Sequence, residues 1–256
     1  VRTGMYGDKR DVLFPDSPKG LPQSEYTIAT LLKDAGYSTA CVGKWHVGHK
    51  EESMPWSHGF DLYYGIPYSN DMSTREQLAV YKNPNYKYDL PFYDQSEIIE
   101  YEPDQTQLTK RLTEYTISYI NKTKNEPFFL YLAHPMPHIP LYASEAFQGK
   151  SLRGKYGDAV EEIDWGIGQI LQALYDNGIE DNTLVIFTSD NGPWLTFDLD
   201  GGSAGLLKDG KASTYEGGHR VPCIIWGSIV KSASITDMGS SLDLLPTLCD
   251  IAGGRL

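Results

Sequence analysis

Apolar positions along the chain change between helical spacing and short continuous runs. Residues 24–37 predict a helix with Ser24 as its N-cap, a stripe made by Ile28, Leu31 and Leu32, and a stop at Gly36. A buried strand follows at once over 38–43. The same alternation predicts helices over 104–124, 160–174 and 241–252, and strands over 127–133, 182–190 and 220–226.

Helices that alternate with buried strands are typical of an α/β protein. We therefore expect a mostly parallel, mixed sheet sandwiched by helices. Residues 50–103 are rich in Tyr, Pro, Asn and Asp and have little periodicity, so we expect an irregular excursion there.

Composition narrows the classes of partner. The formal net charge is −12, which argues against binding to nucleic acid or to an anionic membrane surface. No apolar run approaches the ~18 residues that span a bilayer. The cysteines Cys41, Cys223 and Cys249 are far apart, and we expect Cys41 and Cys223 to be buried free thiols within strands.

Chemically active side chains gather after the predicted strands. Lys44 and His46 follow the first strand, His134 and His138 follow the strand 127–133, and Asp190 and Asn191 come directly after the apolar run LVIFTS (184–189) of the strand 182–190. Lys211 lies shortly before the last strand. Ligands of open α/β sheets bind at the carboxyl ends of strands, so we expect these residues to meet at one edge.

Each short motif alone has an ordinary explanation: Asp-Asn-Gly is common in turns, and a single His or Lys is usually structural or solvated. Together they fit an anion site. Asp190 and Asn191 offer oxygen ligands suited to Ca²⁺ or Mg²⁺ rather than zinc. Lys44 and Lys211 can neutralise an oxyanion, and His46 and His138 can move protons near neutral pH.

Five segments, taken together, resemble the sulfatase family of the alkaline phosphatase superfamily, and arylsulfatases in particular. They are GKWHVG (43–48), HGFDLYYGIPYS (58–69), HPMPHIP (134–140), SDNGP (189–193) and GKASTYEGGHRVP (210–222). The resemblance runs over the whole chain in a consistent order and implies an alkaline-phosphatase-like sulfatase core.

The resemblance also implies a role for each residue that matches a family motif. Asp190 and Asn191 would bind the metal, usually Ca²⁺, with Mg²⁺ as the alternative. Lys44 and Lys211 would bind the sulfate oxygens, and Ser69 would touch them too.

Proton transfer would fall to two histidines. His46 would contact the nucleophile, and His138 would serve the leaving oxygen as an acid. Glu216 and Arg220 would be structural and would fix the loop of Lys211.

The chain departs from the family at the nucleophile, a formylglycine made from the first residue of Cys/Ser-x-Pro-x-Arg. No cysteine lies in that pattern. SMPWS (53–57) has Ser57 where Arg is required, and it follows the Lys-Trp-His motif instead of preceding it. Residues 1–7 resemble the segment that comes after the nucleophile.

We therefore expect residues 1–256 to be a single catalytic domain that lacks the family's first strand, its nucleophile and the small C-terminal domain. We expect the 256-residue chain by itself to leave aryl sulfates intact.

The expected activity of the intact protein is hydrolysis of a small-molecule or carbohydrate sulfate ester, in an exported location: periplasmic, secreted or lysosomal. Two alternatives stay open. One is a phosphate or phosphonate ester hydrolase of the same superfamily, and the other is a non-catalytic anion-binding homologue. The residues specify no oligomeric state.

Overall fold

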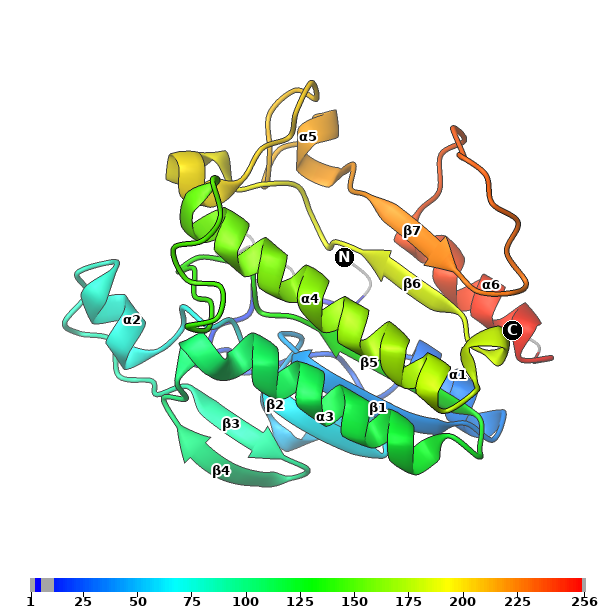
Figure 1. Cartoon of the computed structure of the whole chain (residues 1–256). Coiled ribbons are helices and arrows are strands. Elements are labelled where there is room, and N and C mark those ends of the chain that lie inside the picture. Colours follow the sequence, from blue (N-terminus) through cyan, green and yellow to red (C-terminus); the bar gives the residue numbers. More distant parts are fainter. Residues whose placement is uncertain (1–2, 6–11, 255–256) are drawn as a thin grey trace. The chain divides into compact units, whose positions relative to one another are not determined.

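The structure is a computed structural model that describes residues 3–5 and 12–254 (Figure 1). It contains two compact units, which are described separately. The first consists of Val1–Pro135 and Thr236–Leu256, and the second of Met136–Ile235. Of the segment 1–7, residues 1–2 and 6–7 lie outside the described residues. The single domain over 1–256 stays a prediction.

The first unit is built on a mixed sheet with the strand order β4-β3-β2-β1-β5. Its parallel part consists of β1 (Ser38–Lys44), β2 (Leu62–Ile66) and β5 (Phe128–Ala133). The antiparallel part consists of β3 (Pro91–Asp94) and β4 (Glu97–Tyr101). The predicted mixed sheet with parallel strands is confirmed, and among the described residues two of its four strand pairings are parallel and two antiparallel.

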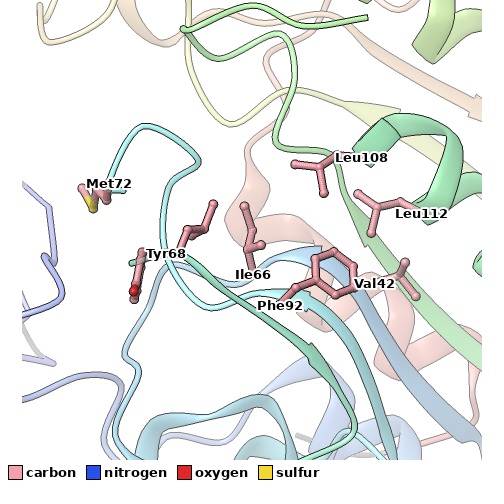
Figure 2. Packing of buried hydrophobic residues seen from close by; sticks show 8 residues of the cluster. Val42, Ile66, Tyr68, Met72, Phe92, Leu108 and Leu112 are labelled. Atoms are coloured by element: carbon pink, nitrogen blue, oxygen red, sulfur yellow. The ribbon is translucent and has the colours of Figure 1, made fainter. Parts of the chain in front are cut away.

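Helices cover both faces of this sheet. Val42 of β1 packs with Leu108 and Leu112 of α3 (Leu108–Thr123), as Figure 2 shows. The preceding residue Cys41 packs with Ala29 of α1 (Ile28–Asp34). Neighbouring residues of a strand point to opposite faces, so α1 and α3 lie on opposite sides. Helix α6 (Leu244–Ile251) packs on α1, and Gly253 ends it with a φ of 71°.

The predicted start and the predicted N-cap of the first helix are wrong. Helix α1 begins at Ile28, and its N-cap is Thr27 instead of Ser24. The Thr27 hydroxyl accepts a hydrogen bond from Thr30 N and donates one to His58 O (2.7 Å). Gly36 does end the helix, with a φ of 89°.

Residues 50–103 are more regular than their composition predicts. They contain β2, β3 and β4, helix α2 (Thr74–Ala79), and the 3₁₀ turns η1 (Glu51–Ser53) and η2 (Pro55–His58). A tertiary contact starts β2: the Asp61 carboxylate accepts the backbone N–H of Thr39 at 2.9 Å. The 3₁₀ turns η3 (Gln105–Gln107) and η6 (Ser241–Asp243) precede α3 and α6.

Strand β4 forms one edge of the sheet. Its apolar residues Ile98 and Ile99 are 40% and 51% exposed. Glutamates stand at its start and near its end, and Glu100 forms an ion pair with Arg111 at 2.6 Å.

The second unit combines a long helix with a two-stranded ribbon. Helix α4 (Gly154–Asp176) buries Ala159 and Ile163 against Met136 and Ile139. Strand β6 (Val185–Thr188) pairs antiparallel with β7 (Cys223–Trp226). Shorter elements are η4 (Glu180–Asn182), η5 (Leu195–Gly201) and α5 (Glu216–His219).

The thiols differ from one another. Cys41 is buried as predicted, but Cys223 is exposed, so that part of the prediction is wrong. The reason is that β7 pairs with β6 alone among the described residues, and all four of its residues are exposed.

Two buried carboxylates of α4 hold the chain between 144 and 151. Asp158 accepts hydrogen bonds from the N–H groups of Gly149, Lys150 and Ser151 at 2.8, 3.1 and 2.8 Å. Burial by itself would raise the pKa of Asp158, but these three donors bring the pKa below its usual value. Glu162 accepts the N–H of Ser144 at 2.9 Å. Side chains of the helix therefore fix this loop.

Within the described residues, no helix has both the length and the apolar character needed to cross a bilayer.

Candidate functional site

Lys44 and His46 lie at the carboxyl end of β1. Lys44 pairs in register with Ile66 of β2, and the N–H of His46 donates to Pro67 O at 3.0 Å. His46 has a φ of 57°, and its Nε2 donates to Leu13 O at 2.9 Å, because a carbonyl only accepts. The sheet ladder and this contact fix the position of the His46 ring.

Ser69 lies three residues after the end of β2. Its side chain is 1% exposed, and its hydroxyl has no hydrogen-bond partner among the described residues. Strands β1 and β2 are parallel and aligned, so Lys44, His46 and Ser69 are at the same edge of the sheet. The structure brings these three predicted residues together.

A pair of buried amides holds the chain next to Ser69. Asn70 Nδ2 donates to Gln105 Oε1 at 2.9 Å, and Gln105 Nε2 donates back to Asn70 O at 3.0 Å. Sequence reasoning missed Gln105, because nothing in the local pattern links positions that are 35 residues apart.

Asp190 and Asn191 follow β6 in the second unit. Asn191 Nδ2 donates to Gly192 O at 2.9 Å, and Gly192 N donates to Gly218 O at 2.9 Å. A Cβ on Gly192 would lie 1.7 Å from Gly217 O. The loop of Asp190 is therefore packed directly against the Glu216-Gly217-Gly218 segment, where only glycine fits.

Lys211 and His138 meet at one aromatic ring. The N–H of Lys211 donates to Pro193 O at 2.8 Å, and its Nζ lies 4.8 Å from the ring centroid of Trp194. The His138 ring centroid lies 5.6 Å from that of Trp194, and His138 Nδ1 donates to Ile139 O at 2.6 Å. Trp194 was not among the predicted residues. The sequence feature that could have indicated Trp194 is its position directly after Asp-Asn-Gly-Pro.

Glu216 and Arg220, which were expected to be structural, form an ion pair at 3.2 Å one helical turn apart. Both side chains are more than half exposed, so the pair adds little to stability.

His134 differs from the predicted histidines. Burial lowers its pKa to about 4, and both of its ring nitrogens are buried without a partner among the described residues. His134 is therefore neutral near pH 7.

The donor set for a metal is small. Among the described residues, no three His, Cys, Asp or Glu side chains gather as a metal site would require. Asp190 and Asn191 together supply at most about three oxygens, against the six to eight that Ca²⁺ takes. Their oxygen chemistry fits Ca²⁺ or Mg²⁺, but further ligands must come from elsewhere.

The predicted residues thus fall into two groups. Lys44, His46 and Ser69 belong to the first unit, while His138, Asp190, Asn191 and Lys211 belong to the second. Lys44, His46 and Ser69 lie at the same edge of the first unit's sheet, and Lys211 and His138 of the second unit both contact Trp194. That the two groups meet at one edge stays a prediction.

Comparison with known proteins places the chain in a family. The family model described as Sulfatase matches residues 1–254. The N-acetylgalactosamine-6-sulfatase of Mus musculus is 38% identical over 266 residues, which cover 99% of this chain and 51% of that protein. The arylsulfatase of Hemicentrotus pulcherrimus is 34% identical over 264 residues, which cover 100% of this chain and 48% of that protein.

A solved structure agrees. Ps i-CgsB, in complex with k-i-k-neocarrahexaose, matches with a TM-score of 0.77 and 32% identity over 96% of this chain and 57% of that one. The chain spans about half the length of the curated relatives it matches. With a family model over nearly all of its residues and relatives of this similarity, the chain belongs to the sulfatase family.

Proposed function

We propose that the protein containing this chain is an arylsulfatase-like sulfuric ester hydrolase. It would cleave sulfate monoesters with a formylglycine nucleophile that lies outside these 256 residues. Family membership supports the reaction class. The observation that carries the proposal for this chain is the gathering of Lys211 and His138 on Trp194, beside the loop of Asp190 and Asn191.

The proposed binding roles follow from charge. Lys44 and Lys211 bind the sulfate oxygens, and Ser69 donates its buried hydroxyl to one of them. One ammonium about 4 Å from a unit negative charge supplies about 4 kcal/mol of attraction at an effective dielectric of 20, before desolvation. Two lysines can therefore hold an anion on a protein with a net charge of −12.

The proposed chemistry has two proton transfers. The sulfur–oxygen bond to the alcohol breaks while a new sulfur–oxygen bond forms to the nucleophile, so that an SO3 group is transferred and His138 gives a proton to the leaving oxygen. His46 then takes a proton from the hydroxyl that remains on the nucleophile, and the sulfate leaves by elimination. The hydrogen bond of His138 to Ile139 O orients its ring for this role.

Sulfatases generally use a metal ion. We propose that Asp190 and Asn191 hold it in this protein, as Ca²⁺ or alternatively Mg²⁺, with other ligands from outside the chain. The ion would supply positive charge to the sulfate oxygens.

We propose a small-molecule or carbohydrate sulfate ester as substrate. Two relatives support this class: one is named N-acetylgalactosamine-6-sulfatase, and another was solved in complex with k-i-k-neocarrahexaose. By analogy with the family we propose an exported location, which is periplasmic, secreted or lysosomal.

The test uses the full-length protein and compares Lys44→Ala and Lys211→Ala on p-nitrophenyl sulfate. We expect each variant to lose at least about 100-fold in kcat/KM. Lys208→Ala is the matched control. Lys208 lies in the same loop, with its Nζ 3.7 Å from the ring centroid of Tyr215, and it should retain activity.

Normal activity in both Lys44→Ala and Lys211→Ala would refute the assigned site. Faster turnover of p-nitrophenyl phosphate than of the sulfate would favour a phosphate ester hydrolase. Binding of sulfate without turnover of either ester would favour the non-catalytic homologue.

A further inference from the structure

Trp194 touches two candidate residues at once. The Lys211 ammonium lies 4.8 Å from the centre of its ring, and the His138 ring is tilted by 51° at 5.6 Å. We propose that Trp194 is a positioning residue, which holds the Lys211 ammonium in place for the sulfate without neutralising it. This inference rests on the proposed function of Lys211 as a sulfate ligand.

The Trp194 ring is held independently of Lys211. The N–H of Trp194 donates to Gly201 O at 3.0 Å, and a Cβ on Gly201 would lie 2.0 Å from Trp194 O. Phe197 packs its ring at 71° to the indole with a centroid distance of 4.7 Å. Because backbone and ring are both fixed, Trp194 can act as a support for a flexible lysine.

The chemistry of the support matters. Within the second unit, Lys211 forms no ion pair with any described residue. Arg220 of the same loop region is paired with Glu216. A carboxylate beside Lys211 would cancel its charge and compete with the substrate anion. An aromatic face attracts a cation through its quadrupole and carries no net charge, so the ammonium keeps its full attraction for sulfate.

His138 leans on the same ring. A rigid indole that contacts both side chains therefore constrains the positions of the residue that binds the sulfate oxygens and of the residue that serves the leaving oxygen. Loss of the ring frees both side chains, and the effect through Lys211 should be seen in substrate binding.

The test is a double-mutant cycle in the full-length protein. Trp194→Leu, Lys211→Met and the double variant are compared with the wild type. The readouts are KM and kcat on p-nitrophenyl sulfate and the Kd of inorganic sulfate by calorimetry.

We expect Trp194→Leu to raise KM and the sulfate Kd about 5- to 30-fold. We expect it to change kcat less than KM. In the Lys211→Met background the same change should add less than about 2-fold.

Conservative and control variants separate positioning from simple loss of structure. Trp194→Phe keeps an aromatic face and should recover most of the affinity, and Trp194→Met serves if the Leu variant fails to fold. Tyr215→Leu removes the other lysine–aromatic contact of the loop, that of Lys208, and should leave KM unchanged. Thermal unfolding checks that each variant is folded.

An equal loss of sulfate affinity with and without Lys211 would overturn the inference, as would a Phe variant no better than the Leu variant. The proposed function fails separately: a wild type that binds sulfate with this coupling but hydrolyses no sulfate ester would contradict the activity and support the positioning role.

Discussion

The end of β1 and the loops of the second unit hold their candidate residues in different ways. Lys44 and His46 are placed by backbone pairing, because β1 lies between β2 and β5 and the next backbone N–H groups continue that ladder. Lys211 and Asn191 are on loops held by glycine contacts, single hydrogen bonds and one aromatic ring. Residues of the first region are therefore fixed by the sheet itself, while those of the second can be displaced by substitutions that leave the sheet intact.

The largest expected effect tests the first region. Gly43 lies in the middle of the sheet with a φ of 111°, and a Cβ there would lie 2.0 Å from Ala133 O. Gly43→Ala should lower the free energy of unfolding by about 4 kcal/mol, measured by urea unfolding. Gly168→Ala is the control: with nothing within 4 Å in helix α4, it should raise stability by up to about 1 kcal/mol. Equal effects of the two would contradict the comparison.

The next prediction tests whether side-chain hydrogen bonds hold the backbone of the second unit's loops, which no sheet hydrogen bonds hold among the described residues. Asp158→Ala removes the acceptor of three backbone N–H groups and should cost about 3 kcal/mol at pH 7. The folded pKa of Asp158 is lowered. Its contribution is therefore present above about pH 4, the unfolded pKa, and is lost as the pH falls through the folded pKa.

Urea unfolding at pH 7 and at pH 3 checks this expectation, because the difference between wild type and Asp158→Ala should narrow at pH 3. The exposed Asp164 of the same helix provides the control, and its Ala variant should change stability by less than about 0.5 kcal/mol. A gap that widens in acid would show that Asp158 does not act through its charge.

A third substitution separates activity from stability. Gly192→Ala would push the Asp190 loop away from Gly217, and we expect about a 100-fold loss of kcat/KM on p-nitrophenyl sulfate in the full-length protein. Its thermal unfolding midpoint should fall less than that of Gly43→Ala. If the midpoint of Gly192→Ala fell as far as that of Gly43→Ala, the loops would contribute as much to stability as the sheet does.

The smallest effect concerns the exposed pair of Glu216 and Arg220. Arg220→Met should change the free energy of unfolding by less than about 1 kcal/mol, since both side chains are solvated. A double-mutant cycle with Glu216→Gln measures the pair directly. A coupling free energy well above about 1 kcal/mol would contradict this expectation and show that the ion pair contributes to stability despite its exposure.

Local patterns predicted the elements that local forces make. The helix α4, the stop of α1 at Gly36 and the strand β1 follow from apolar spacing and from a glycine at positive φ. The alternation of strands and helices also indicated the candidate site residues, because the ends of the strands can be recognised in the sequence.

The missed features depend on contacts between distant segments. Strand β2 forms because Asp61 and the β1 register support a short Tyr-rich run, and its sequence shows no alternation of its own. Trp194 gains its importance from His138 and Lys211, which lie 56 and 17 positions away in the chain. The exposure of Cys223 depends on which strands β7 pairs with, and an apolar run does not reveal its partners.

Strand β4 leaves a row of backbone donors and acceptors open along one side of the sheet, next to Ile98 and Ile99. An edge strand with unpaired backbone groups can pair with a strand of another molecule, and repeated pairing of this kind leads to fibrils. Glu97 opposes this, because a second copy would bring like charges together, whereas the charge of Glu100 is already paired with Arg111. Charge at this edge therefore disfavours self-association of the chain, and high salt weakens that effect by screening.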